Sequence, residues 1–163
     1  DFARMPKPVL KKNDLIKIIH ENIRLLSEID PMIKIDFIND KSSILLECDK
    51  EQISRVILNL IKNSIESIQQ KAENLSDFSK IITIEIFEKN NQIYIIIVDS
   101  GLGFEIFKDN LNEILNPYVT TKKNGTGLGL SIVNKIINDH NGKLNFISIP
   151  NGAKVEIIFN LNK

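Results

Sequence analysis

The stretch GTGLGLSIVNKIINDHNG, residues 125–142, joins a glycine-rich turn to an amphipathic helix. Alternating glycines allow a backbone to approach a ligand closely. The start of the helix would offer free N–H groups and the positive end of its dipole to an anion. The spacing matches neither the P-loop nor the dinucleotide fingerprint. The stretch therefore predicts a phosphate-binding turn and a helix capped by Gly142, although such a turn can also serve only to pack a helix.

The composition is that of an ordinary globular domain. The chain has 163 residues, of which 42% are hydrophobic and 26% charged, enough for one domain with a real core. Its 21 basic residues balance 21 acidic ones, so no basic field favours nucleic acid or a membrane surface. The longest apolar run, IYIIIV from Ile93, is too short to span a bilayer. The single cysteine, Cys48, allows no internal disulfide, and we expect it to be a buried apolar residue.

Hydrophobic periodicity around the opening stretch predicts helices that alternate with pairs of strands. Helical spacing follows a cap at Asn13 or Asp14 and stops before Pro31, and it returns from Asp49 through Ala72. Strand patterns cover residues 32–38 and 42–49, with a turn at 39–40 between them, then 80–88, 92–99, 143–149 and 153–161. Residues 99–125 read as a long irregular loop with one short helix, a kind of loop that is usually functional or mobile. We expect an α+β fold, a two-layer α/β sandwich whose mixed, mostly antiparallel sheet of about five strands is covered on one face by about three helices.

Two further motifs carry polar side chains next to apolar elements. In VDSGLGF, residues 98–104, Asp99 ends a buried strand, where a carboxylate is costly unless it is paired, and a purine amino group would be a suitable donor. Asn59 and Asn63 lie four apart on one face of the long helix, and their amide oxygens would suit a magnesium ion. Taken singly, the first motif can be a plain turn and the second two solvated asparagines.

The motifs taken in order resemble one family. RVILNLIKNSIES (55–67), VDSGLGF (98–104), ILNPYVTTK (114–122) and NGTGLGLSIVNKIINDHNGKL (124–144) resemble the asparagine box, first glycine box, lid box and second glycine box of the catalytic ATP-binding domain of sensor histidine kinases. This domain belongs to the GHKL group, with the Bergerat fold, that includes gyrase. Tyr118 stands where that family usually has phenylalanine. The leading FARMPKPV, residues 2–9, is similar to nitrogen-regulation kinases of the NtrY type.

The resemblance implies a role for each matching residue. Asp99 would accept a hydrogen bond from the adenine amino group of ATP, with Gly101 and Gly103 shaping the edge of the pocket. Asn63 would hold Mg²⁺, with Asn59 as a second ligand or close support. The phosphates of ATP would be held by residues of the mobile lid and the second glycine box: Thr121, Lys122, Gly125, Thr126, Gly127, Leu128, Gly129 and Leu130. Lys62 is another phosphate candidate, although a solvated lysine is the simpler interpretation, and Ile97, Leu130 and Ile132 read better as core than as adenine contacts.

The resemblance also implies partners. Residues 1–12 would be a linker from a missing phosphoacceptor helical hairpin, and residues 13–163 the catalytic domain. This stretch alone would be a monomer, while the longer kinase would be a homodimer. The hairpin would receive the γ-phosphoryl group on a histidine and pass it to an aspartate of a response regulator, with no nucleic acid involved. The domain would lie in the cytoplasm, as part of a membrane-anchored bacterial kinase. Three alternatives are an ATPase of the same fold, an anti-sigma-type serine kinase and a non-catalytic binding domain; Asn59, where such ATPases carry a glutamate, argues against the first.

The stretch IIHENIRLL, residues 18–26, raises the question whether His20 accepts phosphate. A phosphoacceptor motif would continue to a nearby proline, whereas the next proline here is Pro31. His20 also lies after residues 2–9, a segment that would follow the phosphoacceptor hairpin, so the hairpin should already have ended. We therefore expect His20 to be an ordinary solvent-facing residue on the first helix of the domain.

Overall fold

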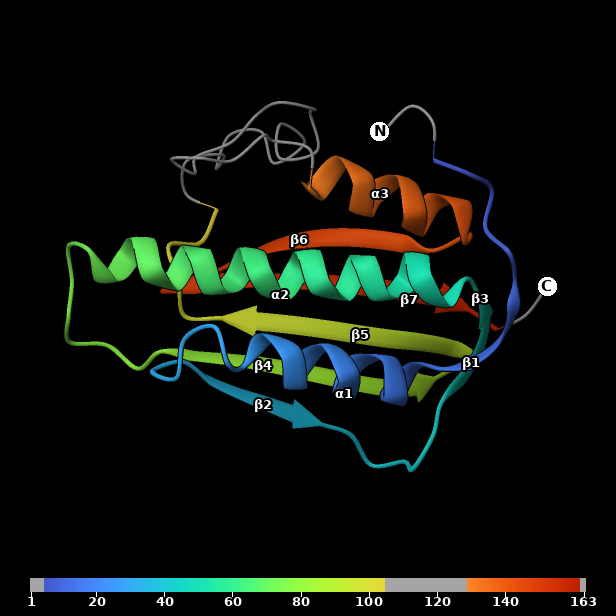
Figure 1. The fold of residues 1–163 in the computed structure, drawn as a ribbon, viewed down its shortest axis with the longest axis horizontal. Helices are drawn as coiled ribbons and strands as arrows, with labels where there is room; N and C mark the ends of the chain where they lie inside the picture. The colour runs from blue at the N-terminus through green and yellow to red at the C-terminus, as the bar shows by residue number, and fades with distance from the viewer. Residues whose placement is uncertain (1–4, 105–128, 162–163) are drawn as a thin grey trace.

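A computed structural model describes residues 5–104 and 129–161, which form a sheet with helices on one face (Figure 1). The helices are α1 (Leu15–Leu26), α2 (Lys50–Ala72) and α3 (Gly129–Asp139). The strands are β1 (Lys11–Asp14), β2 (Lys34–Ile38), β3 (Leu45–Cys48), β4 (Ile81–Lys89), β5 (Gln92–Asp99), β6 (Lys143–Ile149) and β7 (Gly152–Asn160). The predicted α+β sandwich is confirmed.

The main sheet has five strands in the order β2-β4-β5-β7-β6. Its central pairs are antiparallel, whereas β2 lies parallel to β4, so the sheet is mixed as expected. The strands on either side of the turn at 39–40 do not pair with each other. Instead β3 pairs with β1 in a separate two-stranded sheet, in which Lys11 lies opposite Cys48. This second sheet begins at Lys11, two residues before the predicted start of the domain at residue 13.

Two hairpins form at the predicted places because their turns carry asparagine. Asn90 and Asn91, between β4 and β5, have φ values of 53° and 60°, and Asn151, between β6 and β7, has a φ of 60°. Asparagine tolerates this left-handed conformation better than most residues. The β5 and β7 strands pair from Gln92 opposite Asn160 to Asp99 opposite Ala153, which brings the start of β7 beside Asp99.

The long helix α2 buries the predicted apolar stripe against the sheet. Each of its members is at most 2% exposed: Ile53, Val56, Ile57, Leu60, Ile61, Ile65 and Ile68. Burying one side chain of this size stabilises the fold by about 1.5–3 kcal/mol. The helix lies between α1 and α3 and packs against both (Figure 1). Its position makes α2 the element that any site between the helices and the sheet must share.

Side chains cap the starts of α1 and α2. The Asp14 carboxylate accepts a hydrogen bond from the Ile16 N–H at 3.0 Å, and the Asp49 carboxylate accepts one from the Gln52 N–H at 3.1 Å. Asp14 therefore provides the cap that the sequence left open between residues 13 and 14. Although burial opposes ionisation of Asp49, backbone N–H groups, including that of Val9, hold the pKa of its carboxyl below the usual value.

The predicted cap at the end of α3 is wrong by one residue. Asn141, with a φ of 58°, takes the left-handed conformation instead of Gly142. The Gly142 N–H then donates to the Ile137 carbonyl at 2.9 Å, and the Asn141 N–H to the Asn138 carbonyl at 3.0 Å, which is the pattern of a Schellman motif. Gly142 is needed for close packing, because a Cβ there would lie 3.0 Å from the Phe159 ring.

The same end of the molecule joins α2, α3 and the first described residues of the chain. His140, just after α3, accepts a hydrogen bond through Nε2 from the Asp49 N–H at 3.1 Å, while its Nδ1 donates to the Ile136 carbonyl at 2.8 Å. The Val9 N–H donates to Asp49 Oδ2 at 2.9 Å, and Gln52 Nε2 donates to the Pro6 carbonyl at 3.0 Å. The segment before β1 is thus held against the start of α2.

Cys48 ends β3 as a fully buried side chain. Burial and the neighbouring Asp49 charge raise the pKa of its thiol to about 11, although a hydrogen bond with Asn13 opposes the shift. The thiol is therefore protonated at neutral pH and serves as a small apolar core group, as the sequence predicts.

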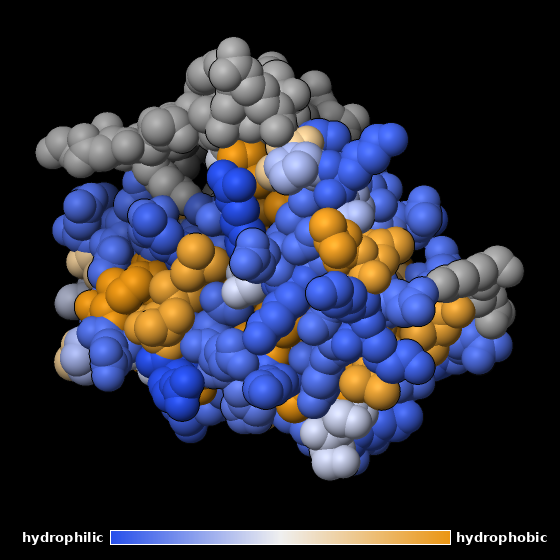
Figure 2. All heavy atoms as spheres, turned by 45° about the vertical axis from the view of Figure 1, so that its right-hand side comes forward, coloured by the Kyte–Doolittle hydropathy of each residue, from blue (hydrophilic) through white to orange (hydrophobic). Residues whose placement is uncertain are grey.

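The visible surface is mostly hydrophilic, with separate apolar patches (Figure 2). The exposed large apolar side chains include Leu25, Ile29 and Met32 near the end of α1, and Val9, Leu10 and Leu45 near the two-stranded sheet. None of the described helices has the length and hydrophobicity needed to cross a membrane.

Candidate nucleotide-binding site

Asp99 is the last residue of β5 and lies buried beneath α2, with 8% of its surface exposed. Its Oδ1 accepts a hydrogen bond from the Gly101 N–H at 2.9 Å. Burial raises the pKa of the Asp99 carboxyl above its usual value of 3.8, against smaller opposing effects of the Gly101 N–H, the Ser64 hydroxyl, the Ala153 N–H and the Lys71 charge. Each oxygen of a carboxylate can accept about two hydrogen bonds, so a buried carboxylate with these partners can still accept a donor from a ligand.

The two glycines after Asp99 are required by their surroundings. Gly101 lies so close to α2 that a Cβ there would collide with the Ser67 side chain and backbone. Gly103 has a φ of 80°, and a Cβ there would lie 2.5 Å from the Gly152 carbonyl oxygen. The turn therefore passes between α2 and the start of β7 with no room for side chains at these two positions.

Asn59 and Asn63 lie one helical turn apart on α2, and both are partly buried. Two amide oxygens on one face are hard donors of the kind that Mg²⁺ accepts. Among the described residues no group of three or more His, Cys, Asp or Glu side chains could hold a metal ion. The donor set therefore fits a magnesium ion that is held by one or two side chains and by the phosphates of a nucleotide, but not a metal held by protein alone. The neighbouring Lys62 is exposed, in agreement with a solvated lysine.

The second glycine box is described only from its last glycine onward. Gly129 begins α3, and Leu130 is partly buried and packs against the core. Ile97 and Ile132 are 2% and 7% exposed, so both are core residues as predicted. The other proposed phosphate contacts lie outside the described residues, so their roles stay predictions: Thr121, Lys122, Gly125, Thr126, Gly127 and Leu128.

Gly101 and Gly129 should respond differently to the same substitution. Among the described residues no atom would lie within 4 Å of a Cβ at Gly129, whereas a Cβ at Gly101 would collide with Ser67 of α2. We expect Gly101→Ala to lower the free energy of unfolding by about 1–3 kcal/mol and to weaken ATP binding. We expect Gly129→Ala to leave the free energy of unfolding within about 0.5 kcal/mol of the parent and still to weaken ATP binding. Urea unfolding and calorimetric titration with Mg-ATP would measure both quantities, and equal loss of stability in the two variants would contradict the assignment of Gly129 to the ligand side.

Three further polar residues of α2, none of them a predicted site residue, also form hydrogen bonds with this turn. The Leu102 N–H donates to Ser67 Oγ at 2.9 Å, and Lys71 Nζ donates to the Ser100 carbonyl at 2.9 Å. Ser64 is 5% exposed and hydrogen-bonds to the Asp99 carboxylate. The signal that could have found two of them is the four-residue spacing itself, because Ser67 and Lys71 continue the row of Asn59 and Asn63 along the helix.

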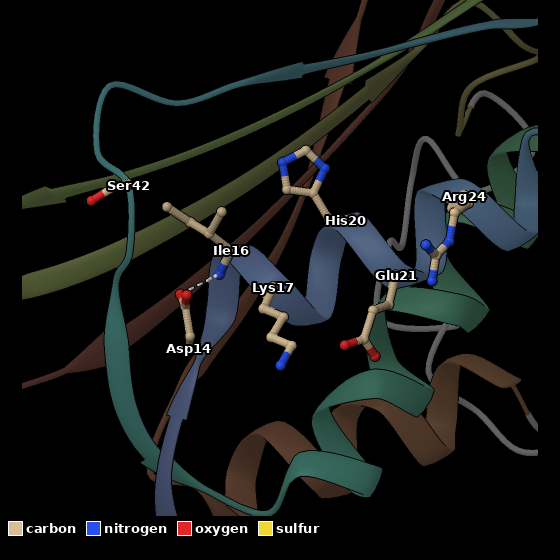
Figure 3. A pocket seen from close by; sticks show the side chains of 7 residues that line it. All are labelled: Asp14, Ile16, Lys17, His20, Glu21, Arg24 and Ser42. Carbon is tan, nitrogen blue, oxygen red and sulfur yellow. Dashed lines mark hydrogen bonds between the residues drawn. The ribbon is translucent and has the colours of Figure 1, made fainter.

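His20 lies on the other side of α2, in an open groove of about 580 Å³. The groove is lined by Asp14, Ile16, Lys17, His20, Glu21, Arg24 and Ser42 (Figure 3). The His20 side chain is exposed, and its ring contacts the Phe37 ring edge-on, with 4.9 Å between the two ring centroids. Figure 3 shows that Glu21 points away from the His20 ring, so the His-Glu pair of the sequence is not a pair in space. The expected solvent-facing position of His20 is confirmed.

Comparison with known proteins identifies the family. The family described as histidine kinase-, DNA gyrase B- and HSP90-like ATPase matches residues 48–163, from the end of β3 to the end of the chain. The chain belongs to this family. As a histidine kinase-like ATPase it carries the asparagine pair and Asp99 within the matched residues, and the predicted family is confirmed.

Individual relatives place this histidine kinase-like ATPase more closely. The nitrogen regulation protein NtrY of Azorhizobium caulinodans is 32% identical over 151 residues, which make up 93% of this chain and 19% of that protein. The catalytic domain of histidine kinase ThkA has a TM-score of 0.79 and 28% identity, covering 93% of this chain and 97% of that domain. A structure of histidine kinase ThkA in complex with response regulator protein TrrA has a TM-score of 0.73 and 27% identity, covering 94% of this chain and 42% of that one. The chain spans about a fifth to a quarter of the length of the curated relatives it matches. The predicted function, the ATP-binding catalytic domain of a sensor histidine kinase, is supported by all of these relatives.

Proposed function

We propose that this chain binds Mg-ATP between α2, α3 and the end of β5, and that it transfers the γ-phosphoryl group to a histidine on a separate phosphoacceptor domain. The observation that carries the proposal is the buried Asp99, whose carboxylate is held by the Gly101 N–H and lies beside the helix that bears Asn59 and Asn63. One helix thereby supplies support for a purine acceptor and amide ligands for a metal.

The residues divide the work of binding. Asp99 accepts a hydrogen bond from the adenine amino group through the carboxylate oxygen that Gly101 does not use. Asn63, supported by Asn59, ligates Mg²⁺, and the N-terminus of α3 from Gly129 faces the phosphates. Bound Mg²⁺ would neutralise phosphate charge, which is the main demand of phosphoryl transfer.

Hydrolysis is the less favoured alternative. An ATPase of this fold would need a group to activate water about one turn before Asn63, and residue 59 is an asparagine, which cannot act as a general base. Phosphoryl transfer needs no such base on this chain if the acceptor is a histidine.

The partners follow from the same proposal. The acceptor histidine would lie on a helical hairpin of a longer protein, which would be a homodimer anchored in a bacterial membrane with this domain in the cytoplasm. A response regulator would receive the phosphoryl group next, as supported by the complex that ThkA forms with TrrA. His20 has no part in this transfer.

The proposal is tested with γ-labelled ATP in two preparations. The chain alone with Mg-ATP should bind nucleotide and remain unlabelled. The chain fused to the phosphoacceptor hairpin of an NtrY-type kinase should gain acid-labile label, and the same fusion with the hairpin histidine changed to glutamine should not. A stable phosphohistidine on the chain alone, or no binding of Mg-ATP, would overturn the proposal.

A further inference from the structure

The turn after β5 is fastened to α2 by three side chains that each bind a different atom. Ser64 hydrogen-bonds to the Asp99 carboxylate, Ser67 Oγ accepts from the Leu102 N–H at 2.9 Å, and Lys71 Nζ donates to the Ser100 carbonyl at 2.9 Å. We refer to Ser64, Ser67 and Lys71 as the α2 clamp. It holds three residues of the turn: Asp99 by its side chain, and Ser100 and Leu102 by backbone groups.

The spacing of the clamp follows from helix geometry. Residues three, four and seven apart lie on one side of a helix, so positions 64, 67 and 71 can all face the same turn. The clamp spans about 10 Å along the helix axis, since each residue advances the helix by about 1.5 Å. The turn after β5 follows this length of the helix, so all three contacts are present together.

Lys71 is itself held in place. Its Nζ lies 4.6 Å from the centroid of the Phe78 ring and 3.5 Å from the Asn151 carbonyl, in addition to its bond to Ser100. A lysine fixed by two carbonyls and an aromatic face loses little further freedom when a ligand binds. Its charge also lies near enough to Asp99 to favour the ionised carboxylate.

We infer that the α2 clamp positions Asp99 for the exocyclic amino group of a purine, and so sets the preference of this site for adenine nucleotides. The inference rests on the proposed function, since it takes Asp99 as the adenine acceptor. Ser64, Ser67 and Lys71 are positioning residues: they act through Asp99 and its turn without touching the nucleotide. We expect the α2 clamp to affect only the binding energy contributed by the hydrogen bond between Asp99 and the purine amino group.

The test compares ATP with purine riboside triphosphate, which lacks the amino group. Dissociation constants for both are measured with Mg²⁺ by calorimetry. The parent chain should bind ATP about tenfold or more tightly than the analogue, since a hydrogen bond to a charged group is worth that factor or more. Ser64→Ala and Lys71→Met should each reduce this ratio at least about threefold while leaving the affinity for the analogue within about twofold. Ser64→Thr and Lys71→Arg, which keep the donors, should restore most of the ratio.

Matched controls on the same helix are Ser54→Ala and Lys50→Met. The Ser54 hydroxyl accepts from Asn22 on α1, and Lys50 is exposed at the start of α2, so both lie away from the turn. These variants should keep the parent ratio. A second readout is the acidic pH at which ATP affinity falls: Ser64→Ala should move it upward, because the hydroxyl favours the ionised form of Asp99.

The outcomes separate the two proposals. If Ser64→Ala and Lys71→Met weaken both nucleotides equally, the three residues have only a structural role and the clamp inference is wrong. The clamp inference also fails if the ratio is unchanged. If the parent chain itself does not distinguish the two nucleotides, the adenine contact of Asp99 in the proposed function is wrong.

Discussion

Asp99→Asn is expected to weaken ATP binding about a hundredfold without lowering the stability of the nucleotide-free chain. In the parent, one carboxylate oxygen is occupied by the Gly101 N–H. The asparagine oxygen would take over this bond, so that its NH₂ group would face the adenine amino group and two donors would meet. Loss of a charged acceptor together with an unpaired buried donor costs on the order of 3 kcal/mol, or about a hundredfold in affinity. Calorimetric titration with Mg-ATP measures this loss, and unchanged affinity would contradict the role of Asp99.

The stability of the same variant follows from the pKa. Burial raises the pKa of Asp99 in the folded chain above 3.8, so the folded state holds this proton more tightly than the unfolded state does. The free energy of unfolding of the parent should therefore fall as the pH rises from 3.8 through the raised value. Asp99→Asn removes this contribution, so the free energy of unfolding of the variant should depend less on pH. At neutral pH the variant should be at least as stable as the parent. Urea unfolding across that pH range measures both chains, and a variant that is less stable at neutral pH would show that the ionised carboxylate stabilises the fold.

Asn63→Ala is expected to abolish most of the effect of Mg²⁺ on ATP binding. The amide oxygen of Asn63 is the proposed metal ligand, and alanine offers no donor at that position. Affinity for ATP with Mg²⁺ should fall at least about tenfold, while affinity measured with a chelator present should change little. The measurement is the ratio of the two dissociation constants.

Gln69→Ala provides the control for this variant, because Gln69 lies on α2 but is exposed and bonds to Asp30 at 3.2 Å. It should keep the parent ratio. A parent-like magnesium effect in Asn63→Ala would mean that the metal is held elsewhere.

The fold was predictable where local patterns decide it. The cap at Asp14, the apolar stripe of α2 and the turns of the two hairpins all depend on a few neighbouring residues, and the structure agrees with each. Pairing between distant strands cannot be predicted in this way. The alternation of apolar and polar residues shows which face of a strand is buried, but not which strand it pairs with. For that reason the parallel pairing of β2 with β4, and the pairing of β1 with β3, were not foreseen.

The candidate site was predictable from the sequence as a set of motifs, whereas the contacts among its residues were not. Asp99, Gly101 and the asparagine pair stand out because each is unusual for its element. Ser64 and Ser67 do not, since a serine in a helix is unremarkable until its partner is known. The cap at Asn141 was missed because glycine is the residue type that most often takes the left-handed conformation at the end of a helix. Here Gly142 is instead required for close packing.

The length of α2 gives the domain a mechanical property. Its 23 residues make a rod of about 34 Å. Gln52 and Asp49 tie one end to the chain that leads in from the N-terminus, and Lys71 ties the other to the turn beyond β5. Because an α-helix is a rigid element, a displacement of one end would be transmitted to the other. We therefore expect a displacement of the incoming segment to shift the turn at Asp99, together with Asn59 and Asn63 on the same helix.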